Sequence, residues 1–437
     1  MGSGQSGFNM RVGSPACVGL ARPGTIAGSA REGIMTASEG SGRLPLAGLV
    51  VIDFGQIFQG PYATLLLAKG GADVIKIEPP HGEPLRRRAR PGISASLPFA
   101  MLNQNKRAVT LNLKHPRGRE LLFAMVRRAD VLLENFSPGT MDELGVGWSV
   151  LHEINPRLVY ATGTGFGISG PDRDNLAMDL TIQAASGIMS VTGMPDGPPM
   201  KAGPTLVDYM GGIHLYAAVL TALYDRDRSG EGRLVEVAMQ ETVYSSLAAS
   251  FDYYQRTGQP PPRTGNRQAA LSTAPYNVYP TADGHVAIHI VTETHWKNLL
   301  KAMGREELGA DSRFATNADR IAHMDETDAL VADWTRTLPK MEIAARLKAG
   351  RVPSAPVRTA PEVMHDPHMH ERGMLAEIDH PELGLITLPS SPLRLHGLGK
   401  APAAASPTIG QHNDEIYGGW LGLSGTEIAA LKDAGAI

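Results

Sequence analysis

Residues 49–78 read LVVIDFGQIFQGPYATLLLAKGGADVIKIE, and this stretch decides the fold. Residues 49–54 form a continuous apolar run, which is typical of a strand buried on both faces. Gly60-Pro61 opens a helix over residues 62–69, because proline suits a first helical turn, and Gly70-Gly71 ends that helix. Residues 73–78 form a second strand. Strand, helix and strand within about 30 residues predict a βαβ unit.

The same alternation continues along the chain. Residues 108–113, 131–134 and 158–162 are predicted strands, and residues 116–128 are a predicted helix. A long apolar helix is expected at residues 208–224, ended by a charged turn at residues 225–230. An alternating strand follows at residues 234–238. This pattern predicts an α/β domain with a largely parallel sheet.

The composition changes at residues 259–267 (QPPPRTGNR), which are rich in proline and glycine and predict a linker. Residues 276–290 then read as a hairpin that turns at residues 281–284, and helices are expected at residues 295–303, 327–338 and 340–348. Residues 353–357 lead back out, and a last helix is expected at residues 425–434. The predicted boundaries are a large domain at residues 45–230, a linker at 231–270, a small domain at 271–350, and a return linker with the C-terminal part of the large domain at 351–437.

The composition limits the partners and the compartment. The 437 residues carry a net charge of −3, so no nucleic-acid partner is expected. Cys17 is the single cysteine, which excludes an intramolecular disulfide and a cysteine-based metal site and favours the reducing cytosol. We therefore expect a cytoplasmic protein.

Two further expectations concern the N-terminal residues and the longest apolar stretch. Residues 1–44 are rich in glycine, serine, alanine and arginine without periodicity, so we predict a disordered N-terminal extension, with Met35 as a candidate natural start. The longest apolar stretch elsewhere, residues 210–223, is too short for a membrane span, so no membrane partner is expected.

The glycine-rich segment GFGISGPDRDNLAMDLTIQAASG, residues 165–187, contains the candidate reactive group. Asp179 stands between a glycine-rich loop and a run of small residues, where a ligand can approach closely. A carboxylate in this setting suits an enzyme that uses a carboxylate nucleophile. The alternative is that Asp179 caps a helix over residues 180–189. The local pattern leaves both interpretations open.

Other motifs are weaker. Gly55-x4-Gly60 does not match the GxGxxG dinucleotide fingerprint, although ligands of parallel sheets still bind at the carboxyl ends of strands. That rule gathers Phe58, Gln59, Leu111, Asn135 and Phe136 at one rim, where each could also serve loop packing alone. Residues 365–371 (HDPHMHE) could ligate a metal ion, but they read more readily as a helix with Asp366 as its N-cap, so we predict no metal site.

Taken together, seven segments resemble the family III coenzyme A transferases, the CaiB/BaiF family. The segments are LAGLVVIDFGQIFQGPYATLLLAKGGADVIKIEPP (46–80), NKRAVTLNLKHPRG (105–118), VLLENFSPGTMDELG (131–145), GFGISGP…AMDLTIQAASG (165–187), TADGHVAIHI (281–290), DPHMHERGM (366–374) and PTIGQHNDEI (407–416). The resemblance extends from about residue 46 to residue 437, and the order and spacing of the segments make it specific.

The resemblance implies a Rossmann-like large domain with a parallel sheet plus a smaller α+β domain, in an interlocked homodimer. It implies transfer of CoA from an acyl-CoA thioester to a free carboxylic acid, with Asp179 as the nucleophile. The positions that match the family's CoA pocket are Phe58, Gln59, Leu111, Asn112, Leu113, Lys114, Asn135, Phe136, Ser137 and Phe166. Pro79 and Glu143 replace two arginines that contact the CoA phosphates in some members. We expect Lys114 or the arginines at 86–88 to take over these contacts.

The chemistry that the resemblance implies proceeds through an aspartyl anhydride and an enzyme–CoA thioester. Coenzyme A or acyl-CoA is then a substrate, and no tightly bound cofactor or metal is required. Backbone N–H groups of the glycine-rich segment are expected to stabilise the oxyanion, and a glycine loop around Gly265 is expected to exclude water.

The same family contains 2-methylacyl-CoA racemases, which need a base and an acid on opposite faces of the α-carbon. In those enzymes a histidine precedes the aspartate that matches Asp179, whereas this chain has Met178, which cannot carry a proton. The sequence therefore favours transfer over racemisation. A catalytically silent CoA-binding protein would be expected to lack the carboxylate. Similarity along the chain suggests a small, dicarboxylic acid substrate, without identifying the donor or the acceptor.

Overall fold

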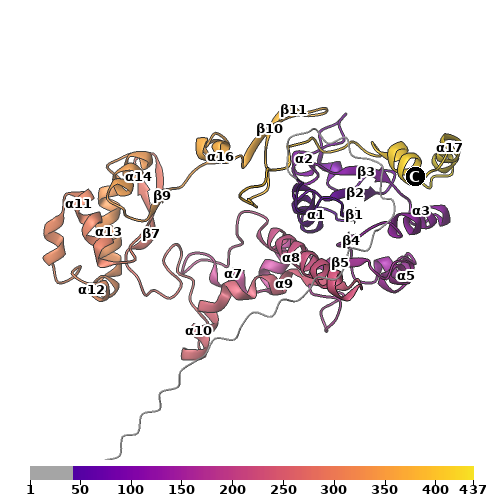
Figure 1. Ribbon diagram of the computed structural model, residues 1–437. Helices are drawn as coiled ribbons and strands as arrows, with labels where there is room; N and C mark the ends of the chain where they lie inside the picture. The colour runs from indigo at the N-terminus through magenta and orange to yellow at the C-terminus, as the bar shows by residue number, and fades with distance from the viewer. Residues whose placement is uncertain (1–42) are drawn as a thin grey trace, which may run out of the picture. The chain divides into compact units, whose positions relative to one another are not determined.

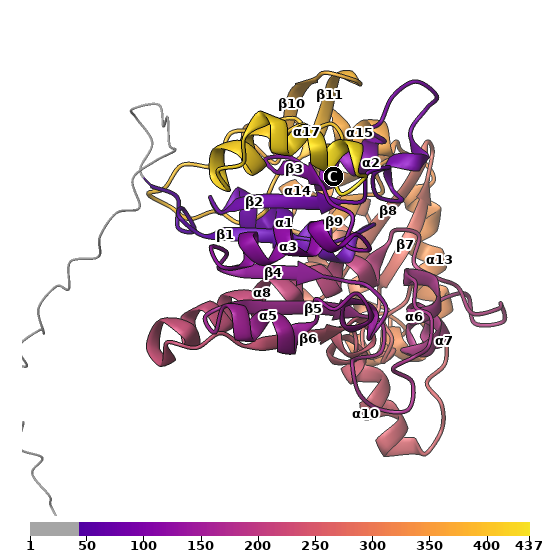
Figure 2. The same cartoon turned by 90° about the vertical axis from the view of Figure 1, so that its right-hand side faces the viewer.

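A parallel sheet of six strands forms the centre of the large domain in the computed structural model, which describes residues 43–437. The spatial order is β3-β2-β1-β4-β5-β6, and every neighbouring pair is parallel. Figure 2 shows the strands in this order, from β3 at the top to β6 at the bottom. The strands are β1 (Val50–Asp53), β2 (Asp73–Glu78), β3 (Arg107–Thr110), β4 (Val131–Glu134), β5 (Val159–Thr164) and β6 (Leu234–Ala238). This is the Rossmann strand order, so the predicted fold class is confirmed.

Successive residues of the central strands point to opposite faces of the sheet. Val51 pairs with Val74 and Val131 in one apolar core, and the next residue, Ile52, lies with Ile75 and Leu132 in the other. Both faces are therefore covered, which explains the continuous apolar runs. One face carries α1 (Gln59–Lys69) and α8 (Leu206–Ser229), and the other carries α3 (Pro116–Val126), α5 (Trp148–Ile154) and α17 (Gly425–Asp433) (Figure 1).

Shorter helices connect these elements. They are η1 (Arg86–Arg88), α2 (Leu97–Leu102), α4 (Thr140–Glu143), α6 (Asp179–Ala185), α7 (Ile188–Val191), α9 (Met239–Thr242), η2 (Tyr244–Leu247) and α10 (Ala248–Thr257).

The C-terminal segment returns to the edge of the large sheet. A π-helix, η4 (Asp414–Trp420), places Ile416 and Tyr417 in the same apolar core as Ile52. The backbone N–H of Ala108 in β3 donates to the His412 ring, and the Tyr417 hydroxyl donates to the Thr110 carbonyl at 2.6 Å. The last residues therefore complete the domain that the first strands begin.

A second domain has its own sheet and its own core. The hairpin of β7 (Tyr276–Thr281) and β8 (Gly284–His289) is confirmed, and β9 (Ser354–Pro356) pairs with β8. Trp296 and Leu299 pack with Ile288 in this core. The helices are α11 (Glu293–Met303), η3 (Glu306–Ala310), α12 (Asn317–Ala322), α13 (Met324–Thr335) and α14 (Lys340–Ala349). The predicted α+β class of this domain is confirmed.

A further hairpin follows the small domain. The helices α15 (Ala360–Met364) and α16 (Pro367–Glu371) precede β10 (Leu375–His380) and β11 (Gly384–Pro389), which pair in antiparallel register. Asp366 accepts a hydrogen bond from the His368 backbone, so its predicted N-cap role is confirmed.

Several predicted boundaries were wrong. The helix expected at residues 208–224 extends through its charged end to Ser229, and Gly230 ends it at φ +83°. The charges fit the helix because Asp227 and Arg228 are exposed, while the buried Arg226 pairs with Asp130 at 3.0 Å. The helix expected at 180–189 is broken at Gly187, whose φ is +90°. The strand expected at 108–113 ends at Thr110, where the Asn112 N–H turns to the carbonyl of Ala436.

Two ranges also change their assignment. β6, α9 and α10 lie within residues 231–270, which were expected to form a linker, and β6 pairs with β5 in the large sheet. Residues 353–357 were expected to lead away from the small domain, but β9 adds a strand to its sheet. Expectations for residues 1–42, including Cys17 and Met35, lie outside the described residues.

The helix α8 is 24 residues long and apolar enough to span a membrane by length and composition, so the expectation that this stretch is too short was wrong. Its apolar residues have another explanation. Leu215, Val219 and Ala222 are buried against α1 and the sheet. The packing of α8 in the large domain accounts for its composition.

Candidate active site

Asp179 is the first residue of α6, at the end of the glycine-rich segment. The helix does not use Asp179 as its cap, because the Thr181 hydroxyl accepts from the Met178 N–H and donates to the Met178 carbonyl, both at 2.9 Å. The expectation that Asp179 caps its own helix is therefore wrong. Its carboxylate is therefore left to contact other groups, one within α6 and two at the start of α8.

The Asp179 carboxylate lies at the N-terminus of α8. Its Oδ1 accepts from the backbone N–H of Val207 at 2.9 Å and from that of Asp208 at 3.4 Å. Thr205, the N-cap residue of α8, makes no side-chain capping bond, so Asp179 supplies the missing acceptor from a distant part of the chain. The positive end of the helix dipole and the two N–H groups stabilise the ionised carboxylate.

Gln183 holds the other oxygen of Asp179. Its Nε2 donates to Oδ2 at 2.6 Å, and the Gln183 side chain is fully buried. The Gln183 Oε1 accepts from the Ala202 N–H at 2.8 Å, which fixes the amide with its NH₂ group toward Asp179. The Asp179 carboxylate is thus held by α6 and α8, with Ala202 fixing the orientation of the Gln183 amide.

A second carboxyl group adjoins the first. Burial and, as the smaller cause, the negative charge of Asp179 together raise the pKa of Asp208 to about 7. Near neutral pH, Asp208 therefore carries its proton part of the time, while Asp179 accepts hydrogen bonds from three donors. Two neighbouring carboxyl groups in such different environments can take different roles in one reaction.

The predicted CoA-pocket residues lie after the strands β1, β3, β4 and β5, as the rule for parallel sheets requires. Phe58 faces the Tyr209 ring at 6.1 Å between centroids, and Phe166 packs in a cluster with Ile182 and Val207, beside Asp179. Phe136 contacts the Phe54 ring at 6.4 Å. Ser137 is exposed at the end of this rim.

Residues 111–114 contact the last residues of the chain in space. The side chains of Leu111 and Leu113 are buried in the core, so only their backbone is available to a ligand. Asn112 donates to the Gly435 carbonyl at 2.9 Å, and its Oδ1 accepts from the Lys114 N–H. The Lys114 side chain is exposed.

Asn135 holds the loop that follows β1. Its Oδ1 accepts from the Gln56 N–H at 2.7 Å, and its Nδ2 donates to the Gln56 carbonyl at 3.0 Å. Because these bonds occupy one lone pair and one N–H group, the geometry gives Asn135 a positioning role for the segment that leads into Phe58 and Gln59.

Buried charges hold the rest of this loop. Ile57 has φ +63°, a strained conformation for a branched side chain, and its N–H donates to Glu83 at 3.1 Å. Lys76 donates to the Gly55 carbonyl at 2.8 Å. Sequence reasoning missed Lys76 and Glu83, although a lysine inside a buried strand was the available signal. It also missed Gln183 and Asp208, which no local pattern distinguishes.

The expectation that the arginines at 86–88 are available to the CoA phosphates is wrong for Arg86. Arg86 donates to both carboxylate oxygens of Glu78 at 2.7 Å and to the Pro407 carbonyl, and its guanidinium lies over the Phe99 ring. Arg86 is therefore committed to the fold and not available to a phosphate. Arg87 and Arg88 are exposed.

The predicted glycine loop contacts the segment after α7. The Gly265 N–H donates to the Gly193 carbonyl at 3.0 Å, and Arg263 donates to the Gly197 carbonyl. Among the residues that the structure describes, no group of three or more histidine, cysteine, aspartate or glutamate side chains is placed to hold a metal ion.

The comparisons with known proteins agree with this fold. The model of CoA-transferase family III matches residues 46–413. The chain belongs to this family. Formyl-CoA:oxalate CoA-transferase of Streptomyces coelicolor is 38% identical over 408 residues, which cover 90% of this chain and 99% of the relative. Succinyl-CoA–D-citramalate CoA-transferase of Chloroflexus aurantiacus is 36% identical over 391 residues, covering 89% and 97%.

A solved structure supports the same assignment for this family III CoA-transferase. A CaiB/BaiF family protein from Brucella suis is 32% identical, with a TM-score of 0.79, and the match covers 87% of this chain and all of that one. The resemblance drawn from the seven sequence segments is therefore confirmed, and with it the activity class: the protein is a CoA-transferase.

Proposed function

We propose that this CoA-transferase moves CoA from an acyl-CoA thioester to a free carboxylic acid through covalent intermediates on Asp179. The observation that carries the proposal is the position of the Asp179 carboxylate, held by Gln183 and by two backbone N–H groups at the start of α8. A carboxylate that is oriented before substrate binds meets the positional requirement of a nucleophile.

The proposed steps exchange one activated carbonyl for another. An Asp179 oxygen attacks the thioester carbonyl carbon, the C–S bond breaks, and CoA thiolate leaves a mixed anhydride. The thiolate then attacks the Asp179 carbonyl carbon and expels the donor acid as a carboxylate, which leaves an aspartyl–CoA thioester. The acceptor carboxylate attacks the carbonyl carbon of this thioester and expels CoA thiolate, which gives a second mixed anhydride. The thiolate then attacks the acceptor's carbonyl carbon, which forms the product thioester and releases the Asp179 carboxylate. No net proton is consumed, and no metal or organic cofactor is needed.

The N–H groups that bind Asp179 in the free enzyme suit the second step. When the thiolate attacks the Asp179 carbonyl, negative charge develops on the oxygen that faces Val207 and Asp208. The two N–H groups and the dipole of α8 lie where that charge forms, as an oxyanion hole requires. This assigns to α8 a role that we first expected from the glycine-rich segment.

We propose a small acid with two carboxyl groups as the acceptor. The two relatives described above are named for oxalate and D-citramalate, which are both such acids. We also propose a homodimer. Apolar side chains around Asp179 are strongly exposed, Leu176 at 85%, Met178 at 60% and Leu180 at 53%, and such a surface favours cover by a second copy or by substrate.

The proposal is tested by incubating the protein with formyl-CoA or succinyl-CoA and a panel of acids, and following new thioesters by chromatography. Asp179→Asn should abolish transfer. Because its NH₂ group would face the NH₂ group of Gln183, the matched control is Asp179→Asn combined with Gln183→Glu, which restores a donor–acceptor pair. The double variant should regain thermal stability and remain inactive. Transfer by either variant, or α-proton exchange in deuterated water without transfer, would contradict the mechanism.

A further inference from the structure

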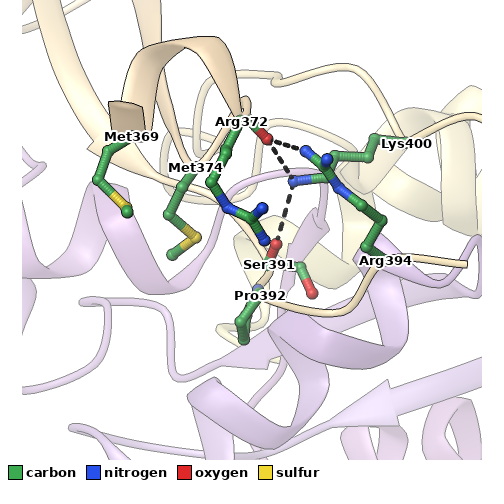
Figure 3. Close-up of a pocket in the computed structure, with 7 residues that line it drawn as sticks. All are labelled: Met369, Arg372, Met374, Ser391, Pro392, Arg394 and Lys400. Atoms are coloured by element: carbon green, nitrogen blue, oxygen red, sulfur yellow. Dashed lines mark hydrogen bonds between the residues drawn. The ribbon is translucent and has the colours of Figure 1, made fainter. Parts of the chain in front are cut away.

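A cavity of about 220 Å³ lies between α16 and the segment that follows β11. Figure 3 shows it with Arg372 and Met369 on one side and Arg394 and Lys400 on the other. Ser391 and Pro392 form its floor in that view. The residues come from chain positions up to 31 apart, so the fold brings them together and local sequence does not.

The charge of the lining has one sign. Arg372, Arg394 and Lys400 contribute three cations, and no lining residue is acidic. Among the described residues, none of the three forms a salt bridge with a carboxylate, whereas most arginines of the preceding small domain do. Mutual repulsion among uncompensated cations costs stability unless an anion binds.

The hydrogen bonds leave donors for such an anion. Lys400 is saturated by the carbonyls of Arg372, Gly373 and Ser391, at 3.3, 3.1 and 3.4 Å, so it joins the two walls and contributes charge. Arg394 donates one N–H to the Arg372 carbonyl. The Arg372 guanidinium has no protein partner among the described residues and points into the cavity in Figure 3.

The cationic field extends beyond the lining. Burial lowers the pKa of Lys400, and the charges of Arg394 and Arg372 lower it further. Burial also lowers the pKa of Lys69 to about 8, with a contribution from Lys400. Lys69 is itself buried and donates to Asn105 at 2.7 Å. Four neighbouring cations therefore lack a compensating acid in the described part of the chain.

We propose that this cavity is a binding site for a phosphate group, held by the guanidinium groups of Arg372 and Arg394. The planar guanidinium matches phosphate oxygens with paired N–H donors. The positive charge of Lys400, whose N–H groups are already bonded to the cavity walls, adds electrostatic attraction for the anion. Met369 and Met374 give the cavity an apolar wall, which suits an organic group attached to the phosphate. The site is separate from Asp179 in the chain and does not depend on the proposed aspartyl mechanism.

The test is isothermal titration of the full-length protein with inorganic phosphate at low ionic strength. Wild type should bind, and affinity should fall as salt is added. Arg372→Gln and Arg394→Gln should each weaken binding by at least about tenfold, the loss expected for one charge-assisted pair. Arg313→Gln is the control, because Asp311 and Glu326 already neutralise that cation. Absence of binding by wild type, or equal binding by wild type and both variants, would overturn the proposal.

A second experiment distinguishes a phosphate of CoA from other sources of phosphate. If the site receives the 3′-phosphate of CoA, removing that phosphate from the acyl-CoA should raise the KM of wild type but not that of Arg372→Gln. Equal KM values for both thioesters, with phosphate still bound in the titration, would assign the site to free phosphate or to another phosphate ester.

Discussion

Oδ1 of Asp179 lies 2.9 Å from the backbone nitrogen of Val207, so the first residue of one helix caps another helix that begins 27 residues later. One carboxylate thereby joins the glycine-rich segment to the core helix of the large domain. The same contact places the proposed nucleophile against its proposed oxyanion donors.

Gln183→Leu should slow transfer by roughly ten- to a hundredfold with little change in the KM for acyl-CoA. The substitution keeps the volume but removes a charge-assisted hydrogen bond to the reacting carboxylate, a loss of about 1.5–3 kcal/mol. Steady-state kinetics measures the effect. Gln240→Leu, which removes a weaker bond at 3.4 Å to the Ala185 carbonyl, is the control and should retain near-normal kcat. Equal losses in both variants would indicate a structural effect alone.

Asp208 should make transfer sensitive to pH around 7. As pH rises through the raised pKa of about 7, Asp208 ionises beside Asp179 and repels an incoming carboxylate, so kcat/KM for the acceptor acid should fall. Asp208→Asn should keep a flat profile between pH 6 and 8, whereas Asp227→Asn, an exposed position on the same helix, should behave as wild type. A wild-type profile that stays flat across this range would refute the role of Asp208.

The raised pKa of Glu134 should make the free energy of unfolding fall as pH rises. Burial raises its pKa in the folded protein to about 7, against about 4.3 in an unfolded chain. Between these values the unfolded carboxyl loses its proton while the folded one keeps it, so the free energy of unfolding falls as pH rises. Glu134→Gln should therefore gain on the order of 2 kcal/mol relative to wild type between pH 5 and pH 8.

Urea denaturation at the two pH values measures this difference, with Glu153→Gln, an exposed position on α5, as the control. The account of Glu134 fails if both variants shift equally between pH 5 and pH 8.

The sequence predicts most of the sheet because buried parallel strands leave an unmistakable apolar pattern. The bounds of β2, β4 and β6 match the predicted ranges, and Gly70-Gly71 and Pro79-Pro80 mark the two ends of β2. The end of α8 was missed because charged residues suit both a turn and an exposed helical face.

The sequence could single out Asp179 as a candidate but could not predict its contacts. Asp179 stands out by its setting in a glycine-rich segment, yet its partners are the N-terminus of α8 and a buried amide fixed by Ala202. Backbone donors carry no residue signature, so no local pattern can identify them. Asn135 likewise matched a ligand position, while its bonds to Gln56 became visible only in three dimensions.

The most direct test of the aspartyl mechanism is intact-mass spectrometry of the protein after incubation with succinyl-CoA and trapping with hydroxylamine. We predict a mass change that maps to Asp179 after proteolysis and is absent from Asp179→Asn. An unchanged mass under conditions in which wild type transfers CoA, or an adduct that persists in Asp179→Asn, would contradict the central claim.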